Sequence, residues 1–287
     1  MTDDAPQTPL SPTALSPTPV SDDIDETLDW TGAPVDCAAC AHADRRVEPG
    51  VALLGGRDCH RCQPGRACVH DRYAKRIQRF FEWNADLAGT HLTHPYFEVR
   101  ANAARVAPIF LLPRLIDDPD ETVRATLARR LPRRLLLKLR DDPDREVRIA
   151  VAVRLEDADL APLMRDPDCS VRLRVVRRIP DGMLPAMMHD EDPEIRVEVA
   201  RRIAADWLPS LIWDDSPRVR LVVVQRLPAS KLHVLIQDAD WMVRLAVAGR
   251  IDSDQLGPLL DDPEEEVRTL ARQRRDGVAI ANDLPPL

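Results

Sequence analysis

Apolar and polar residues recur along most of the chain with a period of 24 residues. From residue 95 onward, each period contains a Val-Arg or Ile-Arg pair, and no insertion interrupts the series. The first residues of these pairs are Val99, Val123, Val147, Val171, Ile195, Val219, Val243 and Val267. A fixed period of this length is typical of a solenoid, in which each repeat packs only against its neighbours.

Each period predicts one amphipathic α-helix. An apolar residue follows the Val or Ile by four positions in every repeat and by eight positions in six of them, which places the three side chains on one helical face. Five Asp-Pro pairs lie upstream, and we expect the aspartate to cap the helix and the proline to occupy its first turn. These pairs are Asp118-Pro119, Asp142-Pro143, Asp166-Pro167, Asp192-Pro193 and Asp262-Pro263.

A second, shorter element follows each predicted helix. Its markers are two Leu or Met residues three positions apart, such as Leu136 and Leu139 or Leu184 and Met187. This spacing predicts a single turn of 3₁₀ type, because 24 residues leave no room for two full antiparallel helices. The repeats therefore predict an all-α solenoid of eight 24-residue units over residues 95–275.

Arginines form two rows along the predicted solenoid. The first arginine row lies one position after the Val or Ile in all eight repeats, and the second arginine row lies seven positions after it in seven repeats. Stacked like charges repel, so both rows need partners. Acidic residues of the turns and exposed carbonyl groups at helix ends are suited to arginine. We therefore expect the rows to tie repeats together rather than to bind a ligand.

The repeat pattern resembles the leucine-rich repeat variant family. Residues 142–164 read DPDREVRIAVAVRLEDADLAPLM, and the other repeats follow the same pattern. The resemblance implies a right-handed superhelix in which an α-helix alternates with a 3₁₀-helix, without strands. Repeats six and seven depart from it at Asp215-Ser216-Pro217 and Asp238-Ala239-Asp240, and Arg275 stands where other repeats carry Leu or Ile. An exposed last repeat accounts for Arg275.

Charge divides the chain into parts. The first 36 residues carry eight acidic and no basic residues, which equals the whole net charge of -8. Residues 1–29 are rich in Pro, Ser, Thr and Asp, so we expect a disordered tail, and residues 276–287 form a C-terminal tail. The near-neutral body makes nucleic acid an unlikely partner. Because no apolar span or signal peptide is present, we expect no membrane contact and a cytoplasmic location.

Residues 30–94 form a small module in which five cysteines crowd together. They are Cys37, Cys40, Cys59, Cys62 and Cys68. Two Cys-x-x-Cys pairs in a reducing compartment indicate a metal site. The residues leave two choices open: a zinc site on the two pairs, or a 4Fe–4S cluster, which also takes four thiolates. The sixth cysteine, Cys169, is interpreted as an incidental thiol.

Two segments of the module resemble the iron–sulfur module found at the N-terminus of leucine-rich repeat variant proteins. They read VDCAACAHAD and CQPGRACVHDRYAKRIQRFF. The resemblance implies a 4Fe–4S cluster and carries the ligand role to Cys37, Cys40, Cys62 and Cys68, with Cys59 as the alternate to Cys62. The basic residues expected near the cluster are Arg57, Arg61 and Arg66. The histidines expected to be solvated rather than ligands are His42, His60 and His70.

An aromatic helix follows the last cysteine. Residues 71–83 read DRYAKRIQRFFEW, and Tyr73, Ile77, Phe80 and Phe81 fall on one predicted face. We expect this face to dock the module onto the first repeat.

No glycine-rich phosphate loop, nucleophile elbow or hydrolase helix is present, so we expect no enzymatic activity. The hypothesis is a scaffold that binds a protein partner along its repeats and carries a redox-linked cluster. The resemblance implies a setting in nitrogen fixation. A purely structural scaffold with a zinc or cluster cap is the alternative, and a helical-repeat nucleic-acid binder is a third possibility.

Overall fold

The computed structural model describes residues 27–46 and 61–278, and these form two compact units, Met1–Pro108 and Ile109–Leu287. The predicted acidic tail, apart from its last three residues, lies outside the described residues. So do Cys59, His60, Arg57 and the end of the C-terminal tail. Within the described ranges, no helix is long and apolar enough to cross a membrane.

The prediction of an all-α solenoid of eight repeats is confirmed. The repeat helices are α2 (Phe97–Val106), α3 (Glu121–Ala128), α5 (Arg145–Arg154), α6 (Cys169–Val176), α7 (Pro193–Arg202), α8 (Pro217–Arg226), α9 (Trp241–Arg250) and α10 (Glu265–Arg275). The first of them, α2, belongs to the first unit, and the other seven belong to the second. Only isolated β-bridges, and no strands, occur in the parts of the chain that the structure describes.

The second element of each repeat is longer than the single turn that the sequence predicts. These elements are η3 (Ile109–Leu115), α4 (Arg133–Leu136) with η4 (Leu137–Leu139), η5 (Asp157–Asp159) with η6 (Ala161–Arg165), η7 (Asp181–Met187), η8 (Ala205–Leu211), η9 (Ala229–Leu235), and η10 (Ser253–Gln255) with η11 (Gly257–Asp261). Prolines such as Pro185 and Pro209 lie inside them. A proline disfavours the α-helical bond pattern, and the α-helical exception α4 leads into Leu137, whose equivalents in three other repeats are Pro113, Pro185 and Pro209.

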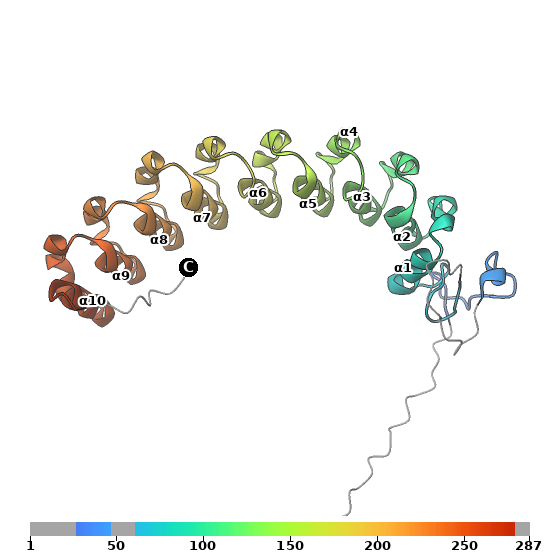
Figure 1. Cartoon of the computed structure of the whole chain (residues 1–287), viewed down its shortest axis with the longest axis horizontal. Coiled ribbons are helices and arrows are strands. Elements are labelled where there is room, and N and C mark those ends of the chain that lie inside the picture. The colour runs from blue at the N-terminus through green and yellow to red at the C-terminus, as the bar shows by residue number, and fades with distance from the viewer. Residues whose placement is uncertain (1–26, 47–60, 279–287) are drawn as a thin grey trace, which may run out of the picture. The chain divides into compact units, whose positions relative to one another are not determined.

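The predicted apolar face forms the core of the stack. In α5, for example, Val147 and Val151 are fully buried, and Leu155 just beyond the helix is 1 % exposed. Consecutive repeat helices of the second unit pack side by side along a curved row (Figure 1). Figure 1 shows α3 and α5 on the inner side of this row and α4 on its outer side.

The helix caps correct one prediction from the sequence. In the repeats that read Asp-Pro-Asp, the second aspartate caps the helix: Asp144, for example, accepts hydrogen bonds from the backbone N–H groups of Glu146 and Val147. Asp142 and Pro143 therefore lie before the helix. Only Asp192-Pro193 follows the predicted arrangement, with proline in the first turn. The first aspartates Asp142 and Asp166 are instead bound by arginines of the first row.

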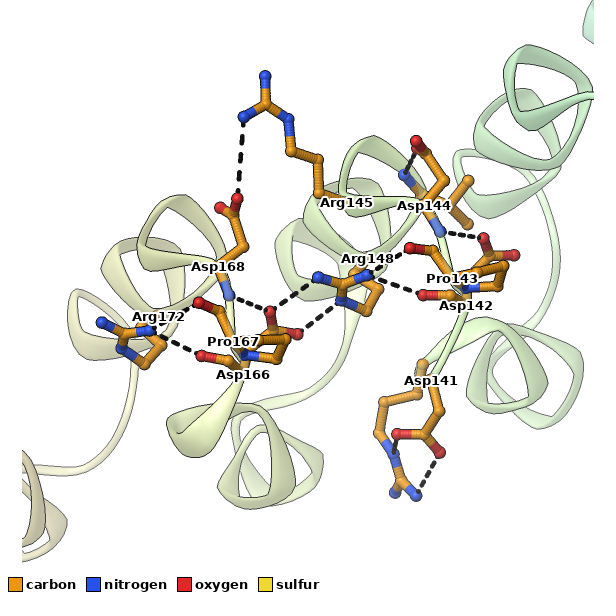
Figure 2. Close-up of polar contacts among 12 residues, drawn as sticks. Asp141, Asp142, Pro143, Asp144, Arg145, Arg148, Asp166, Pro167, Asp168 and Arg172 are labelled. Carbon is orange, nitrogen blue, oxygen red and sulfur yellow. Dashed lines mark hydrogen bonds and ion pairs between the residues drawn. The ribbon is translucent and has the colours of Figure 1, made fainter.

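The first arginine row joins each repeat of the second unit to the next. Each guanidinium donates two hydrogen bonds of 2.7–3.0 Å to the carboxylate 18 residues later. The pairs are Arg124–Asp142, Arg148–Asp166, Arg172–Asp190, Arg196–Asp214, Arg220–Asp238 and Arg244–Asp262. The remaining guanidinium nitrogen, Nη1, donates to the carbonyls of its own turn, as Figure 2 shows for Arg148 with Asp142 and Pro143.

The second arginine row caps helix ends. Arg154 donates to the backbone carbonyls of Ala128 and Leu131 in the preceding repeat, at 3.0 and 2.9 Å. Arg178, Arg202, Arg226, Arg250 and Arg274 bind carbonyls of the preceding repeat in the same way. Helix C-termini leave such carbonyls without partners inside the helix, and cations there also offset the helix dipole. The prediction that both rows are structural is confirmed for these residues.

Removing one arginine of the first row should destabilise the stack. Arg172 and Asp190 have side chains that are each 7 % exposed, so Arg172→Ala leaves a buried carboxylate without its bidentate partner. We expect the free energy of unfolding to fall by about 3 kcal/mol, measured by urea denaturation. Arg174→Ala, at an exposed position of the same helix, should change it by less than about 0.5 kcal/mol. Equal effects of the two variants would contradict this role of the first arginine row.

Candidate metal centre

Four cysteines from separate segments of the first unit line one small cavity. Cys37 and Cys40 belong to the first loop, and Cys62 and Cys68 belong to the second. The backbone N–H of Cys62 donates to the carbonyl of Arg45 at 2.6 Å, which holds the two loops together. The structure thus brings together all four residues to which the resemblance gives the ligand role. Cys59 lies outside the described residues, so the choice between Cys59 and Cys62 stays a prediction.

The segment between Cys62 and Cys68 is a tight turn. Gln63 and Ala67 exchange two backbone hydrogen bonds of 2.8 Å. Gly65 between them has a φ of 71°, a left-handed conformation that glycine adopts without steric cost. The turn directs two nearly buried thiols, Cys62 and Cys68, into the same cavity.

The thiols influence one another. A hydrogen bond between Cys62 and Cys68 lowers the pKa of Cys62 and raises the pKa of Cys68 well above the ordinary value. Burial raises the pKa of Cys37, which the nearby charge of Arg46 partly offsets. Several thiols in one partly buried space do not ionise together readily, so such a set favours a cationic metal centre that stabilises the thiolates.

Backbone N–H groups also point at two of the sulfurs. The N–H of His42 lies 3.4 Å from Sγ of Cys40, and the N–H of His70 is hydrogen-bonded to Cys68. Such donors stabilise negative charge on cluster thiolates. Four thiols around one cavity, with two N–H donors, fit a 4Fe–4S cluster. Among the described residues, no three His, Cys, Asp or Glu side chains are grouped closely enough to hold a single metal ion.

The basic residue at the cavity is not one of those expected. Arg46 lines it, whereas Arg66 is exposed and lies over the ring of Trp83, 6.0 Å from its centre. Arg61 directly precedes Cys62, but its side chain does not line the cavity, and Arg57 lies outside the described residues. Arg46 lies at the end of the first loop, and the spacing of the cysteines does not predict that it lines the cavity.

The expectation of solvated histidines is wrong for His42 and His70. Both are half-buried in a group with His91 and His94, and their rings follow one another at centre distances of 5.3–6.5 Å. Nε2 of His42 lies 3.3 Å from Nε2 of His91, and His42 itself lines the cysteine cavity. Burial lowers the pKa of His42, His70 and His94. Spacing along the chain does not indicate this group, because His42 and His91 are 49 residues apart.

The aromatic helix α1 (Ala74–Trp83) docks the module as predicted, with one exception. Ile77, Phe80 and Phe81 are buried, and α1 packs against α2, the helix of the first repeat. Tyr73, which was expected on this face, precedes the helix and is 44 % exposed beneath the guanidinium groups of two arginines. The Tyr73 hydroxyl accepts a hydrogen bond from Arg72 at 3.0 Å, and its ring lies under the two guanidinium groups rather than in the apolar core.

Asn84, just after α1, is a positioning residue that the sequence analysis missed. It is fully buried, and its amide donates to the carbonyls of Arg61 and Phe80 at 2.7 and 2.8 Å. Its side-chain oxygen accepts a hydrogen bond from Arg45 at 3.0 Å. Asn84 therefore links both cysteine loops to the end of the docking helix.

Comparisons with known proteins agree with this arrangement. Residues 27–90 match the family described as "LRV protein FeS4 cluster". A Rhodobacter capsulatus protein, described as an uncharacterized 27.7 kDa protein in the nifB 3'region, is 48% identical over 95 residues, which cover 33% of this chain and 34% of that protein. The matched region thus spans about a third of that relative's length.

A solved structure resembles the fold as well as the sequence. It is described as "a leucine-rich repeat variant with a novel repetitive protein structural motif". It matches with a TM-score of 0.74 and 41% sequence identity, over 84% of this chain and 98% of that chain. At this identity and coverage, the likeness concerns the whole of the solved protein and not the repeat architecture alone.

Proposed function

The chain belongs to the leucine-rich repeat variant family, and from that premise we propose that it is an iron–sulfur scaffold protein that binds a protein partner along its repeats. The observation that carries the proposal is the meeting of Cys37, Cys40, Cys62 and Cys68 at one cavity. That cavity lies within the residues that match the FeS4 family. We propose these four residues as the ligands of a 4Fe–4S cluster.

When bound, a 4Fe–4S cluster supplies a one-electron redox centre. The chain's own residues determine its surroundings. Cys62 and Cys68, both nearly buried, would hold it together with Cys37 and Cys40, Arg46 would place a positive charge beside the thiolates, and Asn84 fixes both loops to the docking helix. Electron transfer or redox-dependent binding is the function that this setting supports best.

A purely structural cluster or zinc cap is the second candidate. The ring of His42, at the cavity, lies 5.3 Å from the ring of the buried Phe80 on the docking helix. Loss of the metal would therefore disturb the face that packs against the first repeat. The two candidates differ in one respect. A structural cap requires only that the metal is bound, whereas a redox function requires that partner binding or electron transfer changes when the cluster is oxidised or reduced.

The protein partner and the biological setting are further parts of the proposal. The R. capsulatus relative is named for its place beside nifB, and this supports a setting linked with nitrogen fixation. A non-catalytic role is supported by the absence of catalytic motifs from the sequence and by the use of both arginine rows, where the structure shows their partners, for packing. Nucleic acid is disfavoured because these arginines are already paired.

Redox state should change partner affinity if the cluster functions in electron transfer or sensing. One added electron changes the charge beside Arg46 by one unit, which at a partly exposed site is worth a roughly five- to thirtyfold change in affinity. The test is a pull-down from a native extract, prepared without oxygen, with oxidised, reduced and cluster-free protein. We expect a partner that is retained differently by the oxidised and reduced forms. Equal retention in both forms would leave the cluster as a structural cap.

A further inference from the structure

One solvent-facing position of the repeats carries an exceptional residue. This position directly precedes Asp118 and its equivalents at 24-residue intervals up to Asp262. It holds Asp117, Asp141, Arg165, His189, Trp213, Gln237 and Asp261 in successive repeats. All of these are polar or charged except Trp213, whose side chain is 74 % exposed. A tryptophan in a polar row contributes nothing to the core of the stack and presents its ring face to solvent.

Trp213 borders a cleft of about 420 Å³ between two successive turns of the second unit. One wall is the turn 189–191, and the other is formed by residues 210–215. The first-row pair Arg196–Asp214 contributes to the lining, where its bidentate hydrogen bonds hold it in place. The cleft is therefore preformed by the same contacts that stack the repeats.

The cleft is strongly acidic. Four carboxylates line it, from Asp190, Glu191, Asp214 and Asp215, together with Arg196 and His189. Asp190 and Asp214 are engaged by first-row arginines. Glu191 shares Arg172 with Asp190 but remains mostly exposed, and the carboxylate of Asp215 forms no hydrogen bond or ion pair within the described ranges. Asp215 thus adds a carboxylate beside the Trp213 ring that interacts with Arg196 through its charge but is not hydrogen-bonded to it.

A related cleft three repeats earlier provides a comparison. It is lined by residues at equivalent positions, including Leu139 where the later cleft has Leu211, and measures about 460 Å³. Lys138 occupies the place of Ser210 there, and Asp141 occupies the place of Trp213. The earlier cleft therefore contains its own cation and lacks the aromatic ring. The later cleft also has Glu191 and Asp215 in place of Pro119 and Pro143, and His189 in place of Asp117. Each lining holds four carboxylates, so the loss of the lysine and the gain of the tryptophan ring are the differences that favour an external cation.

We propose that the cleft beside Trp213 binds an arginine or lysine side chain from a basic segment of a protein partner. The ring attracts a cation over its face, and Asp215 and Glu191 supply carboxylate acceptors for its N–H groups. Charge complementarity selects this occupant, because an acidic or apolar segment would bury carboxylates without partners. The inference rests on the proposed scaffold function and assigns one contact surface to it.

The test uses the full chain and a short arginine-rich peptide as the probe, with an acidic peptide and a neutral peptide of equal length as references. Binding is measured by calorimetry and by tryptophan fluorescence at low and at physiological salt. We expect the basic peptide alone to bind. Trp213→Ala should weaken its affinity about tenfold, and Asp215→Asn about threefold.

Matched variants keep the result interpretable. Trp207→Ala removes another exposed tryptophan outside the cleft, and Asp206→Asn removes an exposed acidic residue there. Both should bind the peptide as the unaltered chain does, and circular dichroism should show that all four variants keep their helix content. Equal weakening by Trp207→Ala and Trp213→Ala, or no binding of the basic peptide, would overturn the proposal. Because no cluster or extract is needed, such a failure would leave the redox pull-down to judge the scaffold function separately.

Discussion

A Val151→Asp substitution should destabilise the solenoid by about 4 kcal/mol or more. Val151 is fully buried in the middle of α5, which packs between α3 and α6. The substitution removes an apolar side chain from the core and buries a carboxylate that has no cation within the apolar face. In a stack where each repeat depends on its neighbours, the damage should reach adjacent repeats. Urea denaturation followed by circular dichroism measures the change.

Val153→Asp is the matched control, because it makes the same substitution two residues later in the same helix. Val153 is 56 % exposed, so the new carboxylate stays in water and the free energy of unfolding should change by less than about 1 kcal/mol. Similar losses from the two variants would show that helix propensity, rather than burial on the predicted face, governs this repeat.

A Cys62→Ser substitution should abolish cluster binding. Protein isolated without oxygen should contain about four iron atoms and four acid-labile sulfides per chain and show the visible absorbance of a cluster. Cys62 is nearly buried at the cavity, and a serine hydroxyl is a poor substitute for a thiolate ligand of iron. We expect iron and sulfide to fall to a small fraction of their values in the unaltered protein.

Two further variants sharpen this experiment. Cys169→Ser changes the exposed thiol at the start of α6, far along the repeats, and should leave iron and sulfide unchanged. Cys59→Ser should lower the iron and sulfide content less than Cys62→Ser does. The reverse order would show that Cys59 is the ligand. Colourless protein with one zinc per chain would replace the iron–sulfur assignment with a zinc site.

Much of the repeat architecture follows from the sequence, because its determinants are local and repeated. The burial of Val123, Leu127 and Leu131, and of the equivalent residues in other repeats, depends on helical spacing that the sequence displays directly. The need of the arginine rows for acidic and carbonyl partners also follows from charge. The sequence does not show which aspartate caps a helix, because Asp142 and Asp144 are equally good caps. The choice depends on Arg124 in the preceding repeat, which binds Asp142.

The contacts in the cysteine module and in the acidic cleft cannot be predicted from local sequence patterns. Sequence spacing indicated a metal site, and a resemblance selected four cysteines. Only the fold placed Arg46, Asn84 and the histidine group against them, since these contacts join residues tens of positions apart without a repeating pattern. Trp213 is likewise one of five tryptophans in the sequence, and only the fold shows that it is exposed beside the acidic cleft. The sequence by itself determined the helical stack and the chemistry available to it. Tertiary packing decided which of those groups meet, because long-range contacts depend on the geometry of the whole chain rather than on spacing along it.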